Sequence, residues 1–297
     1  MILVTGGSGM VGSELKKIMP EALYPSSKEL NLLSEDKIRN YLKLNNITAV
    51  IHLAAHVGSL HDNIDNRVRY FDDNVLMNTL ITKLSYEAGV KKFIGILSTC
   101  IYPDSGMIYP MNEEQIHNGA PHVDLYSYAY AKRAHAVQLD NYKFQYGLDY
   151  SYLTPTNMYG YSNHTERLHF INDLVLKIVK AKINKSSVIE LFGDGSPLRQ
   201  FMFAGDFARF IKEYYYSGNT QNLNVGDPKN RSVLEMANIA INIADSNIKI
   251  EFNSAKPNGQ SRKDVDMSKM LDSFSNFKFT SFQNGIKKLF NYYEKIL

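Results

Sequence analysis

The chain has little of what several protein classes require. It contains one cysteine among 297 residues, which excludes an intramolecular disulfide framework and a cysteine-rich zinc site. No apolar run approaches the ~20 residues that cross a bilayer, and the first residues lack the basic segment of a signal peptide. A formal net charge of only +3 argues against a nucleic-acid-binding surface. These absences predict a cytoplasmic protein with no membrane, nucleic-acid or metal partner.

Short apolar segments alternate with helical patterns over the first 160 residues. The expected strands are 2–4, a weak 21–24, 48–55, 93–97 and 150–153, and the expected helices are 10–19, 34–44, 74–88 and 126–146. Such alternation predicts an α/β fold with a doubly wound parallel (Rossmann) sheet. After Gly160 the alternation stops, and only a helix at 170–182 and a strand at 188–192 stand out. We therefore expect a dinucleotide-binding domain at 1–160, rejoined by about 200–225. A smaller α/β substrate lobe is expected at 161–199 and 226–297.

Glycines at three-residue spacing join the first strand to the first helix. Glycine allows a tight turn, lets the backbone approach a pyrophosphate and lets the helix pack close to the strand. The positive end of the helix then faces the anion. An ordinary strand–helix turn explains a bare glycine pattern, but the position at the first strand favours a dinucleotide site. The predicted contacts are Gly6, Gly7, Ser8, Gly9, Met10, Val11 and Gly12.

The residues after the second expected strand indicate which dinucleotide binds. NAD sites usually place an acidic residue there for the ribose hydroxyls, whereas this chain has Ser26, Ser27 and Lys28. Two hydroxyls and a cation favour the 2′-phosphate of NADP, and Ser8 can donate to it too. Glu29 lies one residue too late for the ribose, and a solvated turn is the alternative reading.

Two further segments are expected near the cofactor. Leu53, Ala54 and Ala55 end the third strand, where small side chains let the adenine or the pyrophosphate lie close to the backbone. Asn74 stands at the start of the next expected helix. It either braces the backbone or the catalytic lysine, or simply caps the helix.

A tyrosine and a lysine lie one helical turn apart. Tyr128 and Lys132 share a face of the helix 126–146, and Ser98 ends the preceding strand. An ammonium beside a phenol is expected to lower the tyrosine pKa, and the lysine can also hold the nicotinamide ribose. Ser98 can bind the substrate oxygen while Tyr128 protonates it and a hydride reaches the carbonyl carbon. Aromatic packing on a helix is the plainer alternative.

With these motifs placed, the chain resembles the extended short-chain dehydrogenase/reductase superfamily, and within it the GDP-L-fucose synthase family. The resemblance covers nearly the whole chain, and its most specific part is the Ser-Thr-Cys-Ile-Tyr-Pro run at 98–103. It implies NADP(H), a GDP-sugar substrate, a homodimer, and reduction of a 4-keto sugar with epimerisation at carbons 3 and 5. It also implies cofactor contacts at Leu97, Lys132, Pro155, Asn157 and Met158.

The resemblance assigns the epimerisation to a cysteine and a histidine, which map onto Cys100 and His169. A 4-keto group acidifies both neighbouring carbons, and a thiol and an imidazole can remove and return those protons. Taken alone, Cys100 reads as a small buried hydrophobe. Segment 161–168 departs from the family pattern, so His164 is a rival to His169.

The remaining matches are expected substrate contacts, alongside Ser98, Cys100 and Asn157. Lys177 and Arg199 suit the diphosphate, and Phe192, where the family often has tryptophan, suits stacking on guanine. Lys256 and Asn258 complete the set, although the family usually has aspartate at the second position. A solvated surface explains Lys177 and Lys256 equally well.

Four other readings compete. A 4-reductase of a GDP-4-keto-hexose or GDP-4-keto-heptose without epimerase activity fits the altered segment 161–168 and Asn258. A sugar 4,6-dehydratase needs acidic residues where this chain has Cys100 and Ile101, and a UDP-galactose-type 4-epimerase is disfavoured by Cys100. A non-catalytic cofactor sensor need not retain the serine, tyrosine and lysine together.

Overall fold

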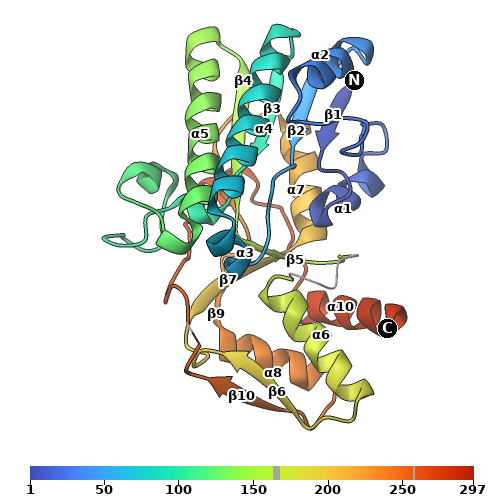
Figure 1. Cartoon of the computed structure of the whole chain (residues 1–297), viewed down its shortest axis with the longest axis vertical. Helices are drawn as coiled ribbons and strands as arrows, with labels where there is room; N and C mark the ends of the chain where they lie inside the picture. The colour runs from blue at the N-terminus through green and yellow to red at the C-terminus, as the bar shows by residue number, and fades with distance from the viewer. Residues whose placement is uncertain (163–167, 257) are drawn as a thin grey trace.

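The computed structural model describes residues 1–162, 168–256 and 258–297. A sheet flanked by helices forms the upper part of the molecule in Figure 1, and a group of helices and short strands forms the lower part. The central sheet is parallel, with the order β1-β2-β3-β4-β8. Its strands are β1 (Ile2–Thr5), β2 (Ala49–His52), β3 (Lys92–Ile96), β4 (Asp149–Pro155) and β8 (Leu223–Val225).

Helices cover both faces of this sheet, as the alternation in the sequence predicts. Val4 packs with α1 (Met10–Ile18) and α7 (Ala204–Ser217), whereas its neighbour Leu3 packs with α2 (Glu35–Leu44), α4 (Arg67–Glu87) and α5 (Tyr126–Tyr146). Successive strand residues face opposite sides, so the two helix layers lie on opposite faces. The chain changes face after β1, which places a crevice at the carboxyl end of that strand.

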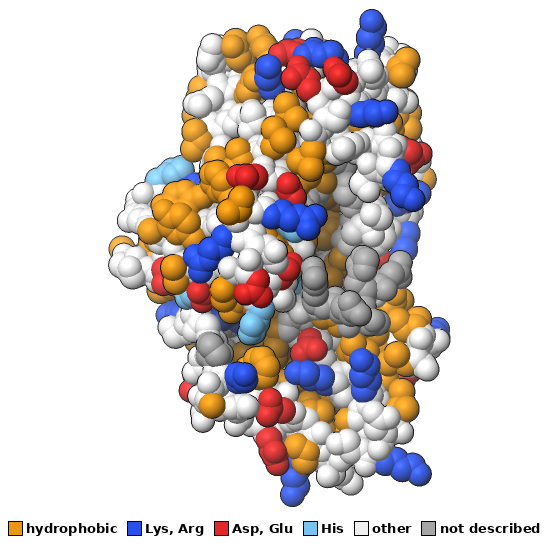
Figure 2. Space-filling view, viewed as in Figure 1, with side chains coloured by type: hydrophobic (Ala, Val, Ile, Leu, Met, Phe, Trp, Pro, Cys, Tyr) orange, Lys and Arg blue, Asp and Glu red, His pale blue; other side chains and the backbone are white. Residues whose placement is uncertain are grey.

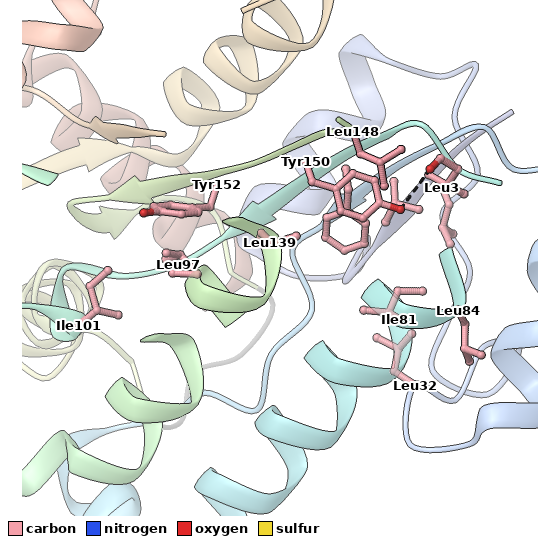
Figure 3. Close-up of a cluster of buried hydrophobic side chains, with 14 of the residues drawn as sticks. Leu3, Leu32, Ile81, Leu84, Leu97, Ile101, Leu139, Leu148, Tyr150 and Tyr152 are labelled. Carbon is pink, nitrogen blue, oxygen red and sulfur yellow. Dashed lines mark hydrogen bonds between the residues drawn. The ribbon is translucent and has the colours of Figure 1, made fainter. Parts of the chain in front are cut away.

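Figure 3 shows part of the core on the α2, α4 and α5 face. Leu3, Ile81, Leu139 and Tyr150 come from four different elements and turn their side chains into one cluster of buried residues. The Tyr150 hydroxyl donates to the carbonyl of Val90 at 3.1 Å, so its polar atom is satisfied inside the cluster. The burial of many apolar side chains together fixes α4 and α5 on the sheet.

Three elements differ from the sequence prediction. The weak strand 21–24 is reduced to a single bridge between Leu23 and Leu3, because Pro25 offers no backbone donor to extend the pairing. β2 ends at His52, and residues 53–55 have no regular secondary structure. The helix expected at 74–88 begins at Arg67, after a short α3 (Leu60–Asp65), because its polar first turns carry no apolar stripe that reveals them.

The lower part contains two small sheets. β7 (Leu198–Phe203) pairs in parallel with β5 (Asn157–Tyr159) and antiparallel with β9 (Asn230–Ser232), and β6 (Val188–Phe192) pairs in parallel with β10 (Lys249–Asn253). A separate buried cluster joins these strands to three helices. The helices are α6 (Phe170–Ile183), α8 (Val233–Ile243) and α10 (Phe282–Ile296).

The segment expected to form the end of the substrate lobe is divided between the two parts. α9 (Ser268–Ser273) and the residues after it return to the sheet, where Met270, Phe274 and Phe277 pack beside Phe210 of α7. Large aromatic side chains bury wherever an apolar face is available, and α7 provides one. The boundary 226–297 therefore does not separate two packing units. Among the described residues, no helix has the length and apolar character needed to cross a membrane.

Candidate active site

A cleft of about 560 Å³ lies where the carboxyl ends of β3 and β4 meet the lower part. Its lining extends in sequence from Val57 to Lys263, because the cleft is shared by both parts of the fold. The sequence-predicted catalytic and substrate residues in this lining are Ser98, Cys100, Tyr128, Asn157, His169, Lys177, Phe192, Arg199 and Asn258. Predicted cofactor residues Leu97, Pro155 and Met158 line it too.

The loop after β3 is held in place by side-chain to backbone hydrogen bonds. The Ser98 hydroxyl accepts from the Cys100 amide at 3.3 Å and caps the short 3-10 helix η1 (Thr99–Ile101). From α5, the Arg133 guanidinium donates to the carbonyls of Ile101 at 3.0 Å and Gly119 at 2.8 Å. Arg133 thus fixes the loop that presents the Cys100 thiol, a role that the sequence did not reveal.

Tyr128 and Lys132 both lie on α5, where Lys132 is buried and Tyr128 is partly buried at the cleft. The Lys132 ammonium donates to the Ile96 carbonyl at 2.7 Å and lies 6.0 Å from the centre of the Tyr128 ring. Burial lowers the pKa of Lys132 to about 8. Burial also raises the pKa of Tyr128, and charges at Cys100 and Tyr70 act in the same direction. In the protein without bound ligand, the expectation that Lys132 lowers the pKa of Tyr128 is wrong, because desolvation of the phenolate dominates.

Cys100 faces the cleft with a partly exposed side chain. The Lys263 ammonium lies 3.0 Å from its Sγ. Burial raises the pKa of the thiol, but the lysine, the hydrogen bond from Ser98 and the charge of Arg199 outweigh it, and the net shift is downward. Sequence reasoning missed Lys263, because it is one of three cations in the polar stretch 256–264 and carries no periodic or motif signal.

His169 precedes α6 and reaches the cleft from the lower part. Burial lowers the pKa of the ring below its ordinary value, which favours the neutral imidazole. A neutral ring has one nitrogen that donates and one that accepts, so it can move a proton in either direction. Its rival His164 lies outside the described residues.

The outer end of the cleft carries an aromatic ring between two cations. Phe192 is 48% exposed, and the ammonium groups of Lys177 and Lys256 lie 5.7 Å and 5.8 Å from its ring centre. Lys177 also forms an ion pair with Asp173 at 3.0 Å. Lys256 is exposed and reaches Phe192 without lining the cleft itself. An exposed ring flanked by cations provides a stacking surface for a flat, electron-rich group.

The remaining predicted substrate residues differ in how far their polar atoms are occupied. The Asn258 side-chain oxygen accepts from the Asp194 amide at 2.8 Å, and the Asn157 amide donates to the Gln200 carbonyl at 3.1 Å. Both side chains therefore support loops and retain one polar atom for a ligand. Within residues 1–162, 168–256 and 258–297, Arg199 forms no ion pair with a carboxylate, which leaves its charge available to an anion.

The glycine loop has the geometry of a dinucleotide site. Gly6 adopts a φ of +72°, and a Cβ there would lie 2.7 Å from the Ala54 amide nitrogen. A Cβ on Gly12 would lie 2.4 Å from the Gly6 carbonyl oxygen. Gly9 caps α1 without a side-chain hydrogen bond, and Ser8, Gly9 and Met10 line a cavity of about 340 Å³. The loop therefore fits a pyrophosphate at the amino end of α1.

Comparison with known proteins places this geometry in a family. Residues 2–226 match the model of the NAD dependent epimerase/dehydratase family. The chain belongs to this family.

Two curated relatives align with nearly the full length of this chain. A GDP-L-fucose synthase from Dictyostelium discoideum is 33% identical over 97% of this chain and 93% of its own. A GDP-L-colitose synthase from Yersinia pseudotuberculosis is 32% identical over 98% of this chain and 97% of its own. The crystal structure of a GDP-L-fucose synthetase from Naegleria fowleri bound to NADP is 30% identical and superposes with a TM-score of 0.89. That superposition covers 99% of this chain and 94% of the other. The resemblance deduced from the motifs is confirmed.

The structure of this epimerase/dehydratase family member also refines the predicted cofactor residues. The Glu29 carboxylate accepts from both the amide and the hydroxyl of Ser26 at 2.7 Å, so the acidic residue shapes the turn that exposes Ser27 and Lys28. Asn74 is buried in the middle of α4 and does not cap it.

The Asn74 side chain accepts from the His56 amide at 2.9 Å and donates to the His56 carbonyl at 3.0 Å. It therefore braces the loop after β2, in which Leu53, Ala54 and Ala55 are partly buried. Among the described residues, no group of histidine, cysteine and acidic side chains forms a metal site.

Proposed function

We propose that the chain is an NADP(H)-dependent enzyme that epimerises a GDP-4-keto-6-deoxy sugar at carbons 3 and 5 and reduces carbon 4. The observation that carries this proposal is that Cys100 and His169 line the same cleft as Ser98 and Tyr128. Two independent proton-transfer pairs beside one reacting sugar match a combined epimerase and reductase. The two full-length synthase relatives support the same reading.

The epimerisation uses the acidity that the 4-keto group gives to its neighbouring carbons. Cys100 takes the proton, and the electron pair of the broken C–H bond passes through the new enolate to the carbonyl oxygen. His169 returns a proton to the opposite face, which inverts the carbon. Both side chains line the cleft, so they can face the same sugar ring.

The reduction uses the second pair. NADPH, when bound, supplies the hydride that adds to carbon 4. The Ser98 hydroxyl binds the carbonyl oxygen and Tyr128 protonates it. Burial keeps the Tyr128 phenol neutral, and the neutral phenol is the form that gives a proton in the reducing direction. Lys132 supports the phenol from the next turn of α5 and holds the nicotinamide ribose.

The cofactor and the substrate occupy different parts of the fold in this proposal. Residues 1–160 with 200–225 hold NADP through the glycine loop, and the exposed Ser27 and Lys28 take the 2′-phosphate. Residues 161–199 and part of 226–297 hold the GDP-sugar. Phe192, which lies between the ammonium groups of Lys177 and Lys256, stacks on guanine. Lys177 and Arg199 bind the diphosphate.

The paired helices α4 and α5 present an apolar face that suits a homodimer. Hydrophobic side chains gather over these helices in Figure 2. Tyr126, Val137 and Phe144 are exposed and lie on one stripe of α5, and Val68 and Phe71 are exposed on the adjacent α4. A second copy of the same helix pair would cover this face. A reduced catalytic thiol requires a reducing compartment, which supports a cytoplasmic setting.

One alternative is a 4-ketoreductase without epimerase activity, acting on a GDP-4-keto-hexose or GDP-4-keto-heptose. The observation that favours it is Asn258, whose side-chain oxygen is engaged by the Asp194 amide in a position where a carboxylate is usual. A sugar of different shape at this end of the cleft would place carbons 3 and 5 away from Cys100.

The deciding experiment supplies NADPH and GDP-4-keto-6-deoxy-mannose to the purified enzyme in deuterated water. NADPH oxidation is followed by absorbance, and deuterium in the product is mapped by NMR. Oxidation with deuterium at carbons 3 and 5 supports the combined enzyme. Oxidation without deuterium supports the reductase alone, and no oxidation rejects this sugar and directs the test to the heptose analogue.

A further inference from the structure

A buried ammonium lies against the single thiol of the chain. Lys263 is 8% exposed, and its Nζ lies 3.0 Å from the Sγ of Cys100. Among the residues that the structure describes, no carboxylate forms an ion pair with this ammonium. A buried charge without a counter-charge is costly, because lost hydration is not offset. The thiolate form of Cys100 supplies the missing negative charge, whereas a neutral thiol leaves the ammonium uncompensated.

The backbone on both sides of Lys263 is fixed. The amide of Val265 donates to the Gln200 side chain at 3.0 Å, and the same side chain donates to the Val265 carbonyl at 3.2 Å. The Met111 amide donates to the Asp264 carbonyl at 3.0 Å on the same side, and on the other side the Leu198 amide donates to the Ser261 carbonyl at 2.9 Å. The lysine therefore stands on a clamped segment, and its contact with the thiol does not depend on a free loop.

Other polar groups face the thiol from the elements packed around it. Ser98 after β3, Arg199 on β7 and Tyr128 on α5 each interact electrostatically with it. Arg199 and Ser98 act with Lys263 to lower the pKa of Cys100 against the effect of burial. The Tyr128 phenol stays neutral beside the sulfur, because the charge at Cys100 raises its pKa further.

We propose that Lys263 is the positioning residue that holds Cys100 as a thiolate, the form in which it can take the proton in the epimerisation proposed above. The inference rests on the proposed function. A sulfur lone pair forms the new S–H bond, and the C–H electron pair becomes the carbon–carbon double bond of the enolate. The negative charge moves from sulfur to the carbonyl oxygen, and the ammonium keeps its proton throughout. No oxidant or reductant takes part.

The first test titrates the thiol without any substrate. Cys100 is the sole cysteine, so alkylation of the full-length protein by iodoacetamide reports on it alone. The midpoint of alkylation rate against pH is expected below about 8.5 in the wild type. In Lys263→Met it should rise by at least about one unit, which slows alkylation at neutral pH about tenfold and leaves the high-pH plateau unchanged. Lys263→Arg should restore the low midpoint.

The control is Lys269→Met, which removes an exposed ammonium from the same part of the chain. It should leave the midpoint at its wild-type value. The ultraviolet absorbance of the thiolate gives the same titration without requiring access for a reagent, which covers a variant whose cleft has closed. An identical midpoint in wild type and Lys263→Met overturns the role of Lys263.

The second test follows deuterium at carbons 3 and 5 during turnover in deuterated water. In Lys263→Met the label is expected to fall about tenfold relative to wild type at neutral pH and to recover as the pH is raised through the new midpoint. A purely structural lysine would give a loss that pH does not reverse, and that result overturns the proposal. If the wild type incorporates no label, the proposed epimerase is wrong and the thiolate is not a base, even where the titration shows the ion pair.

Discussion

The inner and outer ends of the cleft differ in how far their functional side chains are exposed to solvent. At the inner end, Cys100, Tyr128, Lys132 and Lys263 are wholly or mostly shielded, and burial or a neighbouring charge displaces the pKa of the first three. At the outer end, Phe192 is half exposed and its flanking ammonium groups are open to solvent. Burial strengthens electrostatic interactions and makes an uncompensated charge costly, whereas water and salt screen exposed charges.

This difference separates chemistry from binding. Groups whose protonation must be controlled lie where the environment can shift a pKa, and groups that only hold a ligand lie where no shift is required. Substitutions at the inner end should therefore change turnover and pH dependence, and substitutions at the outer end should change affinity. Four predictions test that separation, beginning with the largest effect.

The largest loss is expected from Tyr128→Phe at the inner end. Removing the hydroxyl deletes the group that protonates the carbonyl oxygen, so kcat should fall by roughly 10³. NADPH affinity, measured by fluorescence titration, should stay within about twofold because the ring remains. Tyr126→Phe, at an exposed position on the same helix, serves as the control and should leave kcat unchanged. Unaltered turnover in Tyr128→Phe would exclude the proposed acid and favour a cofactor sensor.

Lys132 should give the protein a distinctive dependence of stability on pH. Burial holds its pKa at about 8 in the folded chain, against 10.5 unfolded. Between these values the unfolded chain binds the extra proton, so raising the pH favours the folded state. Across this window the free energy of unfolding of wild type relative to Lys132→Met should rise by up to about 3 kcal/mol. Urea denaturation at several pH values measures the difference.

A constant difference between the two proteins from pH 8 to about 10 would show that Lys132 is not desolvated as the structure indicates. The comparison of two variants removes the contribution of the many other groups that titrate in this range. Lys212→Met, which replaces a lysine that donates to the Ile18 carbonyl from α7, provides a second reference.

At the outer end, Phe192→Ala should weaken substrate binding while sparing the chemistry. Loss of a stacking surface is expected to raise KM about tenfold with kcat within about twofold, in line with ~1–3 kcal/mol for an aromatic–base stack. Ile183→Ala removes another exposed apolar side chain from the lower part and should leave both constants unchanged. A drop in kcat with unchanged KM would contradict the division between the two ends.

The smallest effect is expected from Lys256→Gln. Its ammonium is exposed and lies 5.8 Å from the centre of the Phe192 ring, so KM should rise about twofold at low salt and less at high salt. The matched control is Lys249→Gln, at an exposed position on β10, the strand that pairs with the strand of Phe192. A loss larger than that of Phe192→Ala, or one that salt does not reduce, would place Lys256 within the cleft.

The sequence predicted most of the inner end because its residues belong to local patterns. Tyr128 and Lys132 lie one helical turn apart, and Ser98 ends a short apolar strand, so their proximity follows from secondary structure and from the shared edge of a parallel sheet. Lys263 was missed because its position depends on Gln200 and Met111, which are far away in the sequence and hold its backbone through hydrogen bonds. No periodicity records such contacts.

By itself the sequence determined the doubly wound sheet, the glycine loop and the residues that could move a proton, because strand and helix periods and fixed local spacings suffice for these. Only the tertiary structure decided their states. Burial kept Tyr128 protonated against the expected effect of Lys132. Long-range packing placed Asn74 on the loop after β2 and brought Lys263 to Cys100. Desolvation and long-range contact depend on what the rest of the chain packs around a residue, and a local pattern does not contain that information.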